Sequence, residues 1–259
     1  MTTTLIVLKF GGSVLRDELH VRAAAEEVAA FVRRGARVVA VVSALEGTTD
    51  ALLARAKAFA PQPQPFATAQ LLATGELACA ALLGLALDSI GIRAETLDTA
   101  RAGLRTQGNP LDATPIECEL PGVTEALGRA RAVVVPGFAG RDQQGRTTLL
   151  GRGGSDLTAL FLAQRLGAAC RLVKDVDGLY EWDPSRPGKP PRRFATLPWN
   201  AALELDGTIV QHKAVRWARE HGLAFEVGSL GTHDATRVGD FDPVYSSEEA
   251  SHPEPHHAA

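Results

Sequence analysis

Cysteines, aromatic residues and long apolar runs are all scarce in this sequence. The 259 residues include three cysteines, Cys79, Cys118 and Cys170, with no CxxC spacing. This odd number and spacing indicate neither a disulfide framework nor a zinc site, so we expect reduced thiols in apolar surroundings. No uninterrupted apolar run approaches the roughly 20 residues of a membrane span, and the N-terminal MTTTLIVLKF lacks a basic segment and a small-residue cleavage pattern. The sequence therefore predicts a cytoplasmic protein with no membrane partner.

An excess of charge of either sign is also missing. The formal net charge is −3, from 27 Lys and Arg against 30 Asp and Glu, and the two signs are interspersed. A nucleic-acid surface would show a basic patch with interleaved aromatic side chains, which the sequence does not contain. The length suits one large α/β domain or two closely joined lobes. We therefore expect a small-molecule partner and no nucleic acid.

Short runs rich in β-branched residues alternate with helical patterns along the chain. This alternation predicts an α/β fold with a mainly parallel central sheet and helices on both faces. The predicted core strands are Leu5 to Phe10, Val38 to Val42, Ala132 to Pro136, Arg171 to Val176 and Ala224 to Val227. The predicted helices are Leu19 to Arg34, Thr49 to Ala60, Phe66 to Ile90, Val123 to Ala130, Leu157 to Leu166 and Ile209 to His221.

The end of the chain, residues 231–259, is predicted to be a polar and disordered tail. Its last stretch, SSEEASHPEPHHAA, has little apolar surface to bury. The pair His256 and His257 is a candidate for weak metal binding on composition alone. No metal ligands are predicted elsewhere.

Glycine-rich turns follow the predicted strands. KFGGSV, from Lys9 to Val14, places a lysine before Gly11, Gly12 and Ser13, so a cation and backbone N–H groups can meet an anion there. A simple tight turn explains paired glycines equally well, and no GxxxxGK[ST] loop occurs. VSALEGTTD, from Val42 to Asp50, offers hydroxyl groups that suit either a ligand or a helix cap.

The hexapeptide GRGGSD, from Gly151 to Asp156, precedes a predicted amphipathic helix. Its glycines let the backbone approach a ligand, and Arg152 offers a planar fork for a carboxylate or phosphate. Asp156 can be read as a helix cap or as part of an anion site. Because the carboxyl ends of parallel strands meet at one sheet edge, Lys9, Ser13, Thr49 and Arg152 are expected to gather there. Their combination suggests a kinase that acts on an acid.

Six blocks of this sequence match one known pattern in order and spacing. They are LKFGGSV, VVSALEGTTDALL, ATGELACAALL, the long run from VVVPGFAGRDQQGRTTLLGRGGSD to LTALFLAQRLGA, KDVDGLYEWDP, and DGTIVQHKAVRWAREHGLAFEV. From Lys9 to about Ser229 the chain resembles the catalytic domain of aspartokinases, within the amino acid kinase family. The resemblance implies a carbamate kinase-like fold over residues 1–230, with an acid-substrate lobe to about residue 140 and a nucleotide lobe over residues 141–230.

The resemblance implies transfer of the γ-phosphoryl group of ATP, with Mg²⁺, to the side-chain carboxylate of L-aspartate, giving 4-phospho-L-aspartate. Lys9 and Asp156 take the catalytic roles, with Asp156 orienting Lys9 and helping to place Mg²⁺. The implied ATP-binding residues are Lys9, Gly11, Gly12, Ser13, Lys174, Asp175, Tyr180 and Lys213. The implied substrate-binding residues are Ser43, Thr49, Glu76, Phe138, Arg152, Gly153, Gly154 and Ser155, among which Arg152 and Ser155 meet carboxylates and Glu76 meets the ammonium group.

The sequence departs from the family pattern at several positions. Ile209 stands where the family has a nucleotide-contacting lysine, and Lys213 lies one helical turn further on. Lys174 replaces a threonine, and its side chain either approaches the phosphates or lies on the surface. Cys79 replaces the serine of the GExxS segment. No pattern of regulatory amino-acid-binding (ACT) domains follows Ser229, so allosteric inhibition through such domains is not expected.

Three functions remain open at this point. The first is an aspartate kinase, and the second is a related kinase whose acceptor is another small acid or a phosphate. The third is a non-catalytic nucleotide-binding relative, against which Lys9, Asp156 and Asp175 argue. The family also implies a possible homodimer.

Overall fold

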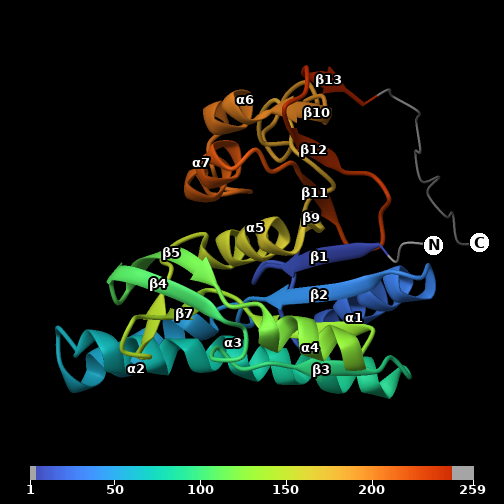
Figure 1. The fold of residues 1–259 in the computed structure, drawn as a ribbon. Helices are drawn as coiled ribbons and strands as arrows, with labels where there is room; N and C mark the ends of the chain where they lie inside the picture. The colour runs from blue at the N-terminus through green and yellow to red at the C-terminus, as the bar shows by residue number, and fades with distance from the viewer. Residues whose placement is uncertain (1–3, 247–259) are drawn as a thin grey trace, which may run out of the picture.

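A nine-stranded sheet runs through the whole molecule (Figure 1). The computed structural model describes residues 4–246. In spatial order the strands are β13 (Val244–Tyr245), β10 (Phe194–Pro198), β12 (Thr236–Gly239), β11 (Phe225–Ser229), β9 (Ala169–Lys174), β1 (Leu5–Phe10), β2 (Arg37–Val42), β6 (Ala132–Pro136) and β3 (Ala94–Thr96). Only the β11–β12 and β10–β13 pairs within this sheet are antiparallel.

Helices cover both faces of this sheet, because successive strand residues point to opposite sides. In β1, Val7 belongs to a core with α5 and α7, whereas Leu8 and Phe10 belong to a second core with α1 and α3. The helices are α1 (Glu18–Arg33), α2 (Thr48–Phe59), α3 (Pro65–Ser89), α4 (Pro121–Arg129), α5 (Gly154–Leu166), α6 (Trp199–Glu204) and α7 (His212–Glu220). The predicted fold class, a mainly parallel sheet with helices on both faces, is confirmed.

A second, four-stranded sheet lies beside the N-terminal half of α3. Its strands, in spatial order, are β5 (Asp112–Cys118), β4 (Leu104–Asn109), β7 (Ala139–Arg141) and β8 (Thr147–Leu149). Ala139 and Leu149 pack on Ala69, Leu72 and Ala73 of α3. This packing fixes the β4–β5 hairpin near the loop that leads into α5.

The predicted core strands and helices agree with the structure to within about three residues at most ends. The largest differences are two helix starts: α5 begins at Gly154 and not at Leu157, and the last helix begins at His212 and not at Ile209. The Asp206 carboxylate accepts hydrogen bonds from the backbone N–H and the hydroxyl of Thr208, and Gly207 has a φ of 74°. These local bonds hold a turn that competes with helix.

The prediction of a disordered tail from residue 231 is wrong for residues 231–246. Strand β12 lies between β10 and β11, and β13 pairs with β10. Thr236 and Val238 are fully buried and Gly239 is buried as well, whereas Arg237 is exposed, so β12 is part of the core. A strand of four residues is too short a pattern for sequence analysis to detect. His256 and His257 lie outside the described residues.

Val238 offers a direct test of this strand. Replacing Val238 with alanine removes a fully buried side chain, and we expect the free energy of unfolding to fall by roughly 1.5–3 kcal/mol. The matched variant is Val244→Ala, because Val244 in β13 is 51% exposed and should change stability by less than about 0.5 kcal/mol. Urea denaturation measures both. Equal, small effects would contradict the placement of β12 in the core.

The three cysteines lie in different parts of the fold, in α3, β5 and β9. Cys79, Cys118 and Cys170 are free and buried, which confirms the prediction of unpaired thiols in apolar surroundings. Burial raises the pKa of Cys79 to about 12 and that of Cys118 to about 11, and it raises the pKa of Cys170 as well. Burial therefore also keeps these thiols protonated near neutral pH.

Helix α3 is long and apolar enough, by length and composition, to cross a membrane, and it is the one such helix among residues 4–246. One face of α3 packs against α1, α2 and the strands β2, β3 and β6. Leu83 and Leu87 on this face are fully buried. Such packing is typical of a core helix.

Candidate active site

The carboxyl ends of four neighbouring parallel strands form the edge at which the candidate site lies. Strands β9, β1, β2 and β6 are adjacent and in parallel register. The chain leaves β1 into Gly11, β2 into Ser43, β6 into Gly137 and β9 into Asp175. Ligands of open α/β sheets bind at this kind of edge.

Two lysines share one buried carboxylate at the centre of this edge. The Nζ atom of Lys9 lies 2.7 Å from Oδ1 of Asp156. The Nζ atom of Lys174 lies 3.0 Å from Oδ1 and 2.8 Å from Oδ2 of the same carboxylate. The three residues are 5%, 2% and 8% exposed, in the order Lys9, Asp156, Lys174. We call these three residues the lysine–aspartate cluster.

Burial and charge act together on the pKa values in this cluster. Burial lowers the pKa of Lys9 to about 8, with the neighbouring Lys174 charge acting in the same direction and Asp156 opposing it. Burial alone would raise the pKa of Asp156, but the charges of Lys174 and Lys9 outweigh it and hold that pKa at about 2. Asp156 is therefore ionised throughout the neutral range.

Asp156 does not cap its helix. The residue before α5 is Gly153, which has a φ of 74° and gives no side-chain cap. Asp156 lies in the first turn, with its carboxylate turned toward the strands. The reading of Asp156 as a helix cap is therefore wrong. Thr48 and Thr49 are not caps either, because Gly47 precedes α2 and no side chain bonds there.

The glycine turn after β1 lies directly beside the cluster. A Cβ atom on Gly11 would lie 3.0 Å from Nζ of Lys9, so the glycine leaves this ammonium group room. The hydroxyl of Ser13 donates to Oδ1 of Asp175 at 3.1 Å. Ser13 and Asp175 thus join the turn after β1 to the turn after β9, next to Lys174.

A second group of predicted residues lies on the side of β2 and α3. The Ser43 hydroxyl donates to Oγ of Ser155 at 2.9 Å. The Oε1 atom of Glu76 accepts from the backbone N–H of Ala44 at 3.2 Å, whereas its buried Oε2 atom has no hydrogen-bond partner in the described part of the chain. Burial raises the pKa of Glu76 to about 7. A buried carboxylate oxygen without a partner is costly, and a cationic ligand group would relieve that cost.

Phe138 lies between β6 and β7 in the chain and contacts the first turns of α5. Its backbone is left-handed, with a φ of 66° that non-glycine residues seldom adopt, and residues held in this way cluster at functional sites. Its N–H donates to the Thr158 hydroxyl, and its carbonyl accepts from the N–H of Leu150. A Cβ on Gly154 would lie 2.9 Å from the Phe138 ring, so this glycine permits the close approach.

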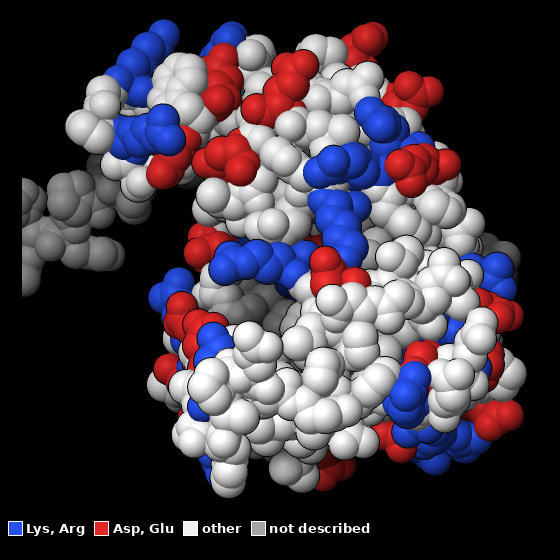
Figure 2. Space-filling model, turned by 90° about the vertical axis from the view of Figure 1, so that its left-hand side faces the viewer, with Lys and Arg blue, Asp and Glu red and all other residues white. Residues whose placement is uncertain are grey.

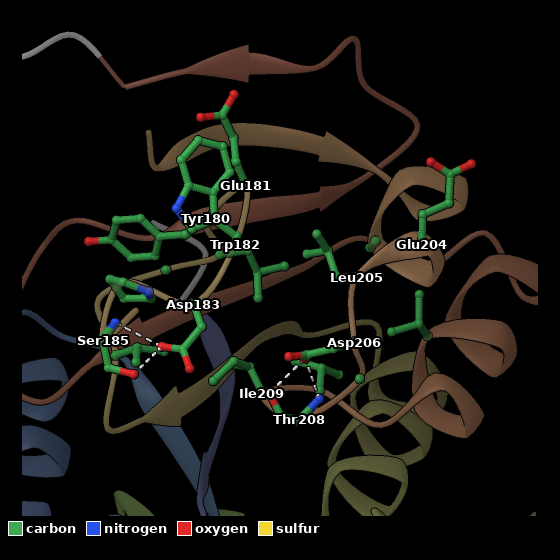
Figure 3. A pocket seen from close by; sticks show the side chains of 18 of the residues that line it. Tyr180, Glu181, Trp182, Asp183, Ser185, Glu204, Leu205, Asp206, Thr208 and Ile209 are labelled. Atoms are coloured by element: carbon green, nitrogen blue, oxygen red, sulfur yellow. Dashed lines mark hydrogen bonds between the residues drawn. The ribbon is translucent and has the colours of Figure 1, made fainter. Parts of the chain in front are cut away.

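A cavity of about 500 Å³ opens on the β9 side of the cluster. It reaches Asp175, and its walls include Tyr180, Trp182 and Ile209 (Figure 3). Tyr180 donates its hydroxyl to Oδ1 of Asp177 at 2.7 Å, which fixes the ring. The volume falls within the range of small-molecule and cofactor sites.

Lys213 lies in a polar groove that shares Asp206, Gly207 and Thr208 with this cavity. Its Nζ atom lies 2.8 Å from Oδ1 of Asp112, at the start of β5, and 2.8 Å from the carbonyl oxygen of Leu150. Arg152 and Arg216 line the same groove, and Figure 2 shows lysine and arginine side chains gathered around a hollow on this face. The structure therefore places Lys213 near Arg152, in the groove that adjoins the cavity, and its role in ATP binding stays a prediction.

The structure brings most of the predicted residues to one sheet edge. Those that lie around the cluster, its glycine turns and the cavity are Lys9, Gly11, Gly12, Ser13, Ser43, Glu76, Phe138, Gly153, Gly154, Ser155, Asp156, Lys174, Asp175 and Tyr180. Thr49 lies in the first turn of α2 without a hydrogen bond from its hydroxyl among those found in residues 4–246, and Arg152 is exposed at the groove. Sequence analysis missed Asp112, because the hairpin that carries it gave no recognisable pattern.

Comparison with known proteins identifies the class to which this fold and site belong. The model of the amino acid kinase family matches residues 4–227, so the chain belongs to this family. Among curated relatives, the aspartokinase of Mycobacterium bovis is 36% identical over 230 residues, which are 87% of this chain and 54% of the relative. The aspartokinase of Helicobacter pylori strain 26695 is 39% identical over 202 residues, which are 78% of this chain and 50% of the relative. The chain spans about half the length of the curated relatives it matches.

Solved structures show the same relationship. An aspartate kinase from Synechocystis is similar with a TM-score of 0.76 and 31% identity, over 91% of this chain and 40% of that one. A UMP kinase from Bacillus anthracis has a TM-score of 0.67 at 16% identity, over 94% of this chain and 99% of that one. The second likeness shows the shared fold alone. Membership of a kinase family implies ATP as the phosphoryl donor.

Proposed function

We propose that this chain transfers the γ-phosphoryl group of ATP to the side-chain carboxylate of L-aspartate. The lysine–aspartate cluster is the observation that carries the proposal, because it places buried positive charge between the nucleotide-sized cavity and the Glu76 side of the edge. Phosphoryl transfer requires mainly positioning and charge stabilisation from the protein. A carboxylate acceptor is already ionised near neutral pH and needs no general base.

The two sides of the edge suit the two substrates. On one side, the base and ribose of ATP would occupy the cavity beside Tyr180, with the phosphates directed toward Ser13 and Lys9. On the other side, Glu76 would bind the ammonium group of the amino acid, and Ser155, together with Arg152 from the Lys213 groove, would bind its carboxylates. The curated relatives that match most of this chain are aspartokinases, which supports aspartate as the acceptor.

Mg²⁺ fits this arrangement as a companion of the nucleotide. Among residues 4–246 no cluster of three or more His, Cys, Asp or Glu side chains could hold a metal ion alone. Mg²⁺ commonly binds through one or two carboxylates together with substrate phosphates. Asp175 is exposed at the end of the cavity and could supply one carboxylate, whereas both oxygens of Asp156 are engaged by lysines. When bound, the ion would neutralise charge on the phosphates.

A hydroxylamine-trapping assay tests the proposal. The protein is incubated with MgATP and L-aspartate, L-glutamate, N-acetylglutamate or other acids, and both hydroxamate and ADP are measured. We expect hydroxamate with L-aspartate. Hydroxamate with another acid alone, or ADP without hydroxamate, would move the acceptor to a different acid, a phosphate or an alcohol. ATP binding without any turnover would favour the non-catalytic function.

Glu76 gives the proposal a pH-dependent signature. The carboxyl group of Glu76 has a pKa of about 7, so it loses its negative charge as the pH falls through 7 and then attracts an ammonium group less strongly. We expect the KM for L-aspartate to rise below pH 7. Glu76→Gln removes the charge, keeps an acceptor for the Ala44 N–H, and should raise KM at pH 8 by about 10- to 100-fold.

The measurement is KM for L-aspartate at pH 6, 7 and 8 in the wild type and Glu76→Gln. The variant should lose most of the pH dependence over this range. Glu26→Gln is the matched control, because Glu26 is exposed on α1. A KM that changes with pH equally in wild type and Glu76→Gln would show that Glu76 does not bind the ammonium group.

A further inference from the structure

Lys174 is positioned to do more than support Asp156. It is the last residue of β9, and its ammonium group is buried with two hydrogen bonds to the Asp156 carboxylate. An ammonium group carries three N–H donors. One donor of Lys174 therefore remains for another acceptor at the sheet edge.

The cluster carries more positive than negative charge. In the described part of the chain, Asp156 is the only carboxylate within 4 Å of either Lys9 or Lys174. Two ammonium groups and one carboxylate leave one buried positive charge without a counter-charge, which is unfavourable in a protein interior. An anionic ligand next to both lysines would remove this imbalance.

The adjacent cavity cannot supply the positive charge that a triphosphate needs. Five acidic residues line it, Asp175, Glu181, Asp183, Glu204 and Asp206, against one basic residue, Arg186; the Glu181 carboxylate is paired with Arg192. Ile209 contributes only an alkyl side chain to this wall (Figure 3). The basic side chains beside the cavity are Lys9 and Lys174, at the ends of β1 and β9, and those of the neighbouring groove, where Lys213 is already paired with Asp112.

We propose that Lys174 is a second catalytic lysine, which contacts the transferring phosphoryl group together with Lys9. This inference rests on the proposed phosphoryl transfer. In the reaction, an acceptor oxygen forms a bond to the γ-phosphorus, and the bond from that phosphorus to the bridging oxygen breaks, with its electron pair passing to ADP. Lys174 donates a hydrogen bond to a non-bridging oxygen and keeps its proton, while Asp156 holds both lysines in place.

Comparison of two nucleotides separates this role from a structural one. ADP lacks the γ-phosphoryl group, whereas AMP-PNP carries it in non-transferable form. For Lys174→Met we expect AMP-PNP, with Mg²⁺, to bind about 10- to 100-fold more weakly in isothermal titration calorimetry. Binding of ADP should change by no more than about threefold, because ADP lacks the phosphoryl group to which Lys174 would donate its hydrogen bond. Retained ADP binding also shows that the variant folds.

Two further variants complete the experiment. Lys57→Met removes an exposed lysine of α2 and should leave both affinities and turnover unchanged. Lys174→Gln keeps a hydrogen-bond donor to Asp156 without the positive charge. It replaces Lys174→Met in the binding experiment if the methionine variant does not fold. With either Lys174 variant, turnover in the hydroxamate assay should fall on the order of 100-fold.

The outcomes distinguish this inference from the proposed function. Equal weakening of ADP and AMP-PNP binding, or no change in either, would assign Lys174 to support of Asp156 and overturn the inference. A wild-type protein that forms hydroxamate from L-aspartate, with Lys174 variants that do so equally well, would overturn it alone. If Lys174 variants lose AMP-PNP affinity but keep ADP affinity, and the wild type forms no hydroxamate from L-aspartate, the inference would be supported. L-aspartate would then be rejected as the acceptor.

Discussion

Replacement of Lys9 by methionine is expected to lower turnover by about 1,000-fold, because a preorganised charge next to the transferring group is lost. Lys9 ends 2.7 Å from Asp156, and the glycine turn after β1 leaves its ammonium group open toward the sheet edge. Methionine has a similar length and fills the same buried space without charge. The measurement is the initial rate of hydroxamate formation at saturating MgATP and acid.

The Lys9 variant also separates a kinase from a binding protein. A nucleotide-binding protein without kinase activity would show no turnover in either the wild type or Lys9→Met. The substitution would then at most weaken the binding of ATP. Lys57→Met is again the control for loss of one lysine, and far-UV circular dichroism checks the fold. Turnover of Lys9→Met at the wild-type rate would show that phosphoryl transfer does not occur at the lysine–aspartate cluster.

Asp156→Asn is expected to produce the largest loss of stability, about 3–5 kcal/mol in the free energy of unfolding at pH 7. The neutral amide of this variant would leave the ammonium groups of Lys9 and Lys174 buried without their carboxylate. Asp175→Asn is the matched control: Asp175 is exposed and its carboxylate meets only the Ser13 hydroxyl in residues 4–246, so the loss should stay below about 1 kcal/mol.

The pH dependence of the stability loss in Asp156→Asn shows whether charge or packing causes that loss. Burial already lowers the pKa of Lys9 to about 8, and loss of Asp156 removes the charge that opposes this shift. Between the lowered pKa of the folded state and the unfolded value of about 10.4, the unfolded chain binds more protons, so stability rises with pH. Urea denaturation should show a smaller loss for Asp156→Asn at pH 9.5 than at pH 7. An equal loss at both values would point to packing and not to charge.

Sequence analysis predicted the central part of the fold well because its signals are local. The strand from Ala132 to Pro136 is a continuous apolar run and that from Leu5 to Phe10 is apolar except for Lys9, and each ends where predicted. The small second sheet was missed, because β4 and β5 are largely polar and β5 contains Pro115. Strand β12 was missed because its burial depends on β10, about 40 residues earlier in the chain.

The candidate site shows the same limit. Glycine turns at strand ends could be recognised in the sequence, and so could Lys9, Asp156 and Arg152. The ion pair between Lys174 and Asp156 could not, because it depends on how β9 and α5 face each other. The unpartnered oxygen of Glu76 and the contact of Lys213 with Asp112 likewise exist only in three dimensions.

The three buried cysteines can be used to measure local opening of the protein. A thiol reacts with an alkylating reagent as the thiolate and only when it is reachable, so each cysteine reacts during transient exposure of its surroundings. Cys79 in α3, Cys118 in β5 and Cys170 in β9 sample the helical layer, the small sheet and the centre of the large sheet. The rates of alkylation at the three sites, followed by mass spectrometry, would therefore compare the opening free energies of these three regions in the unaltered protein.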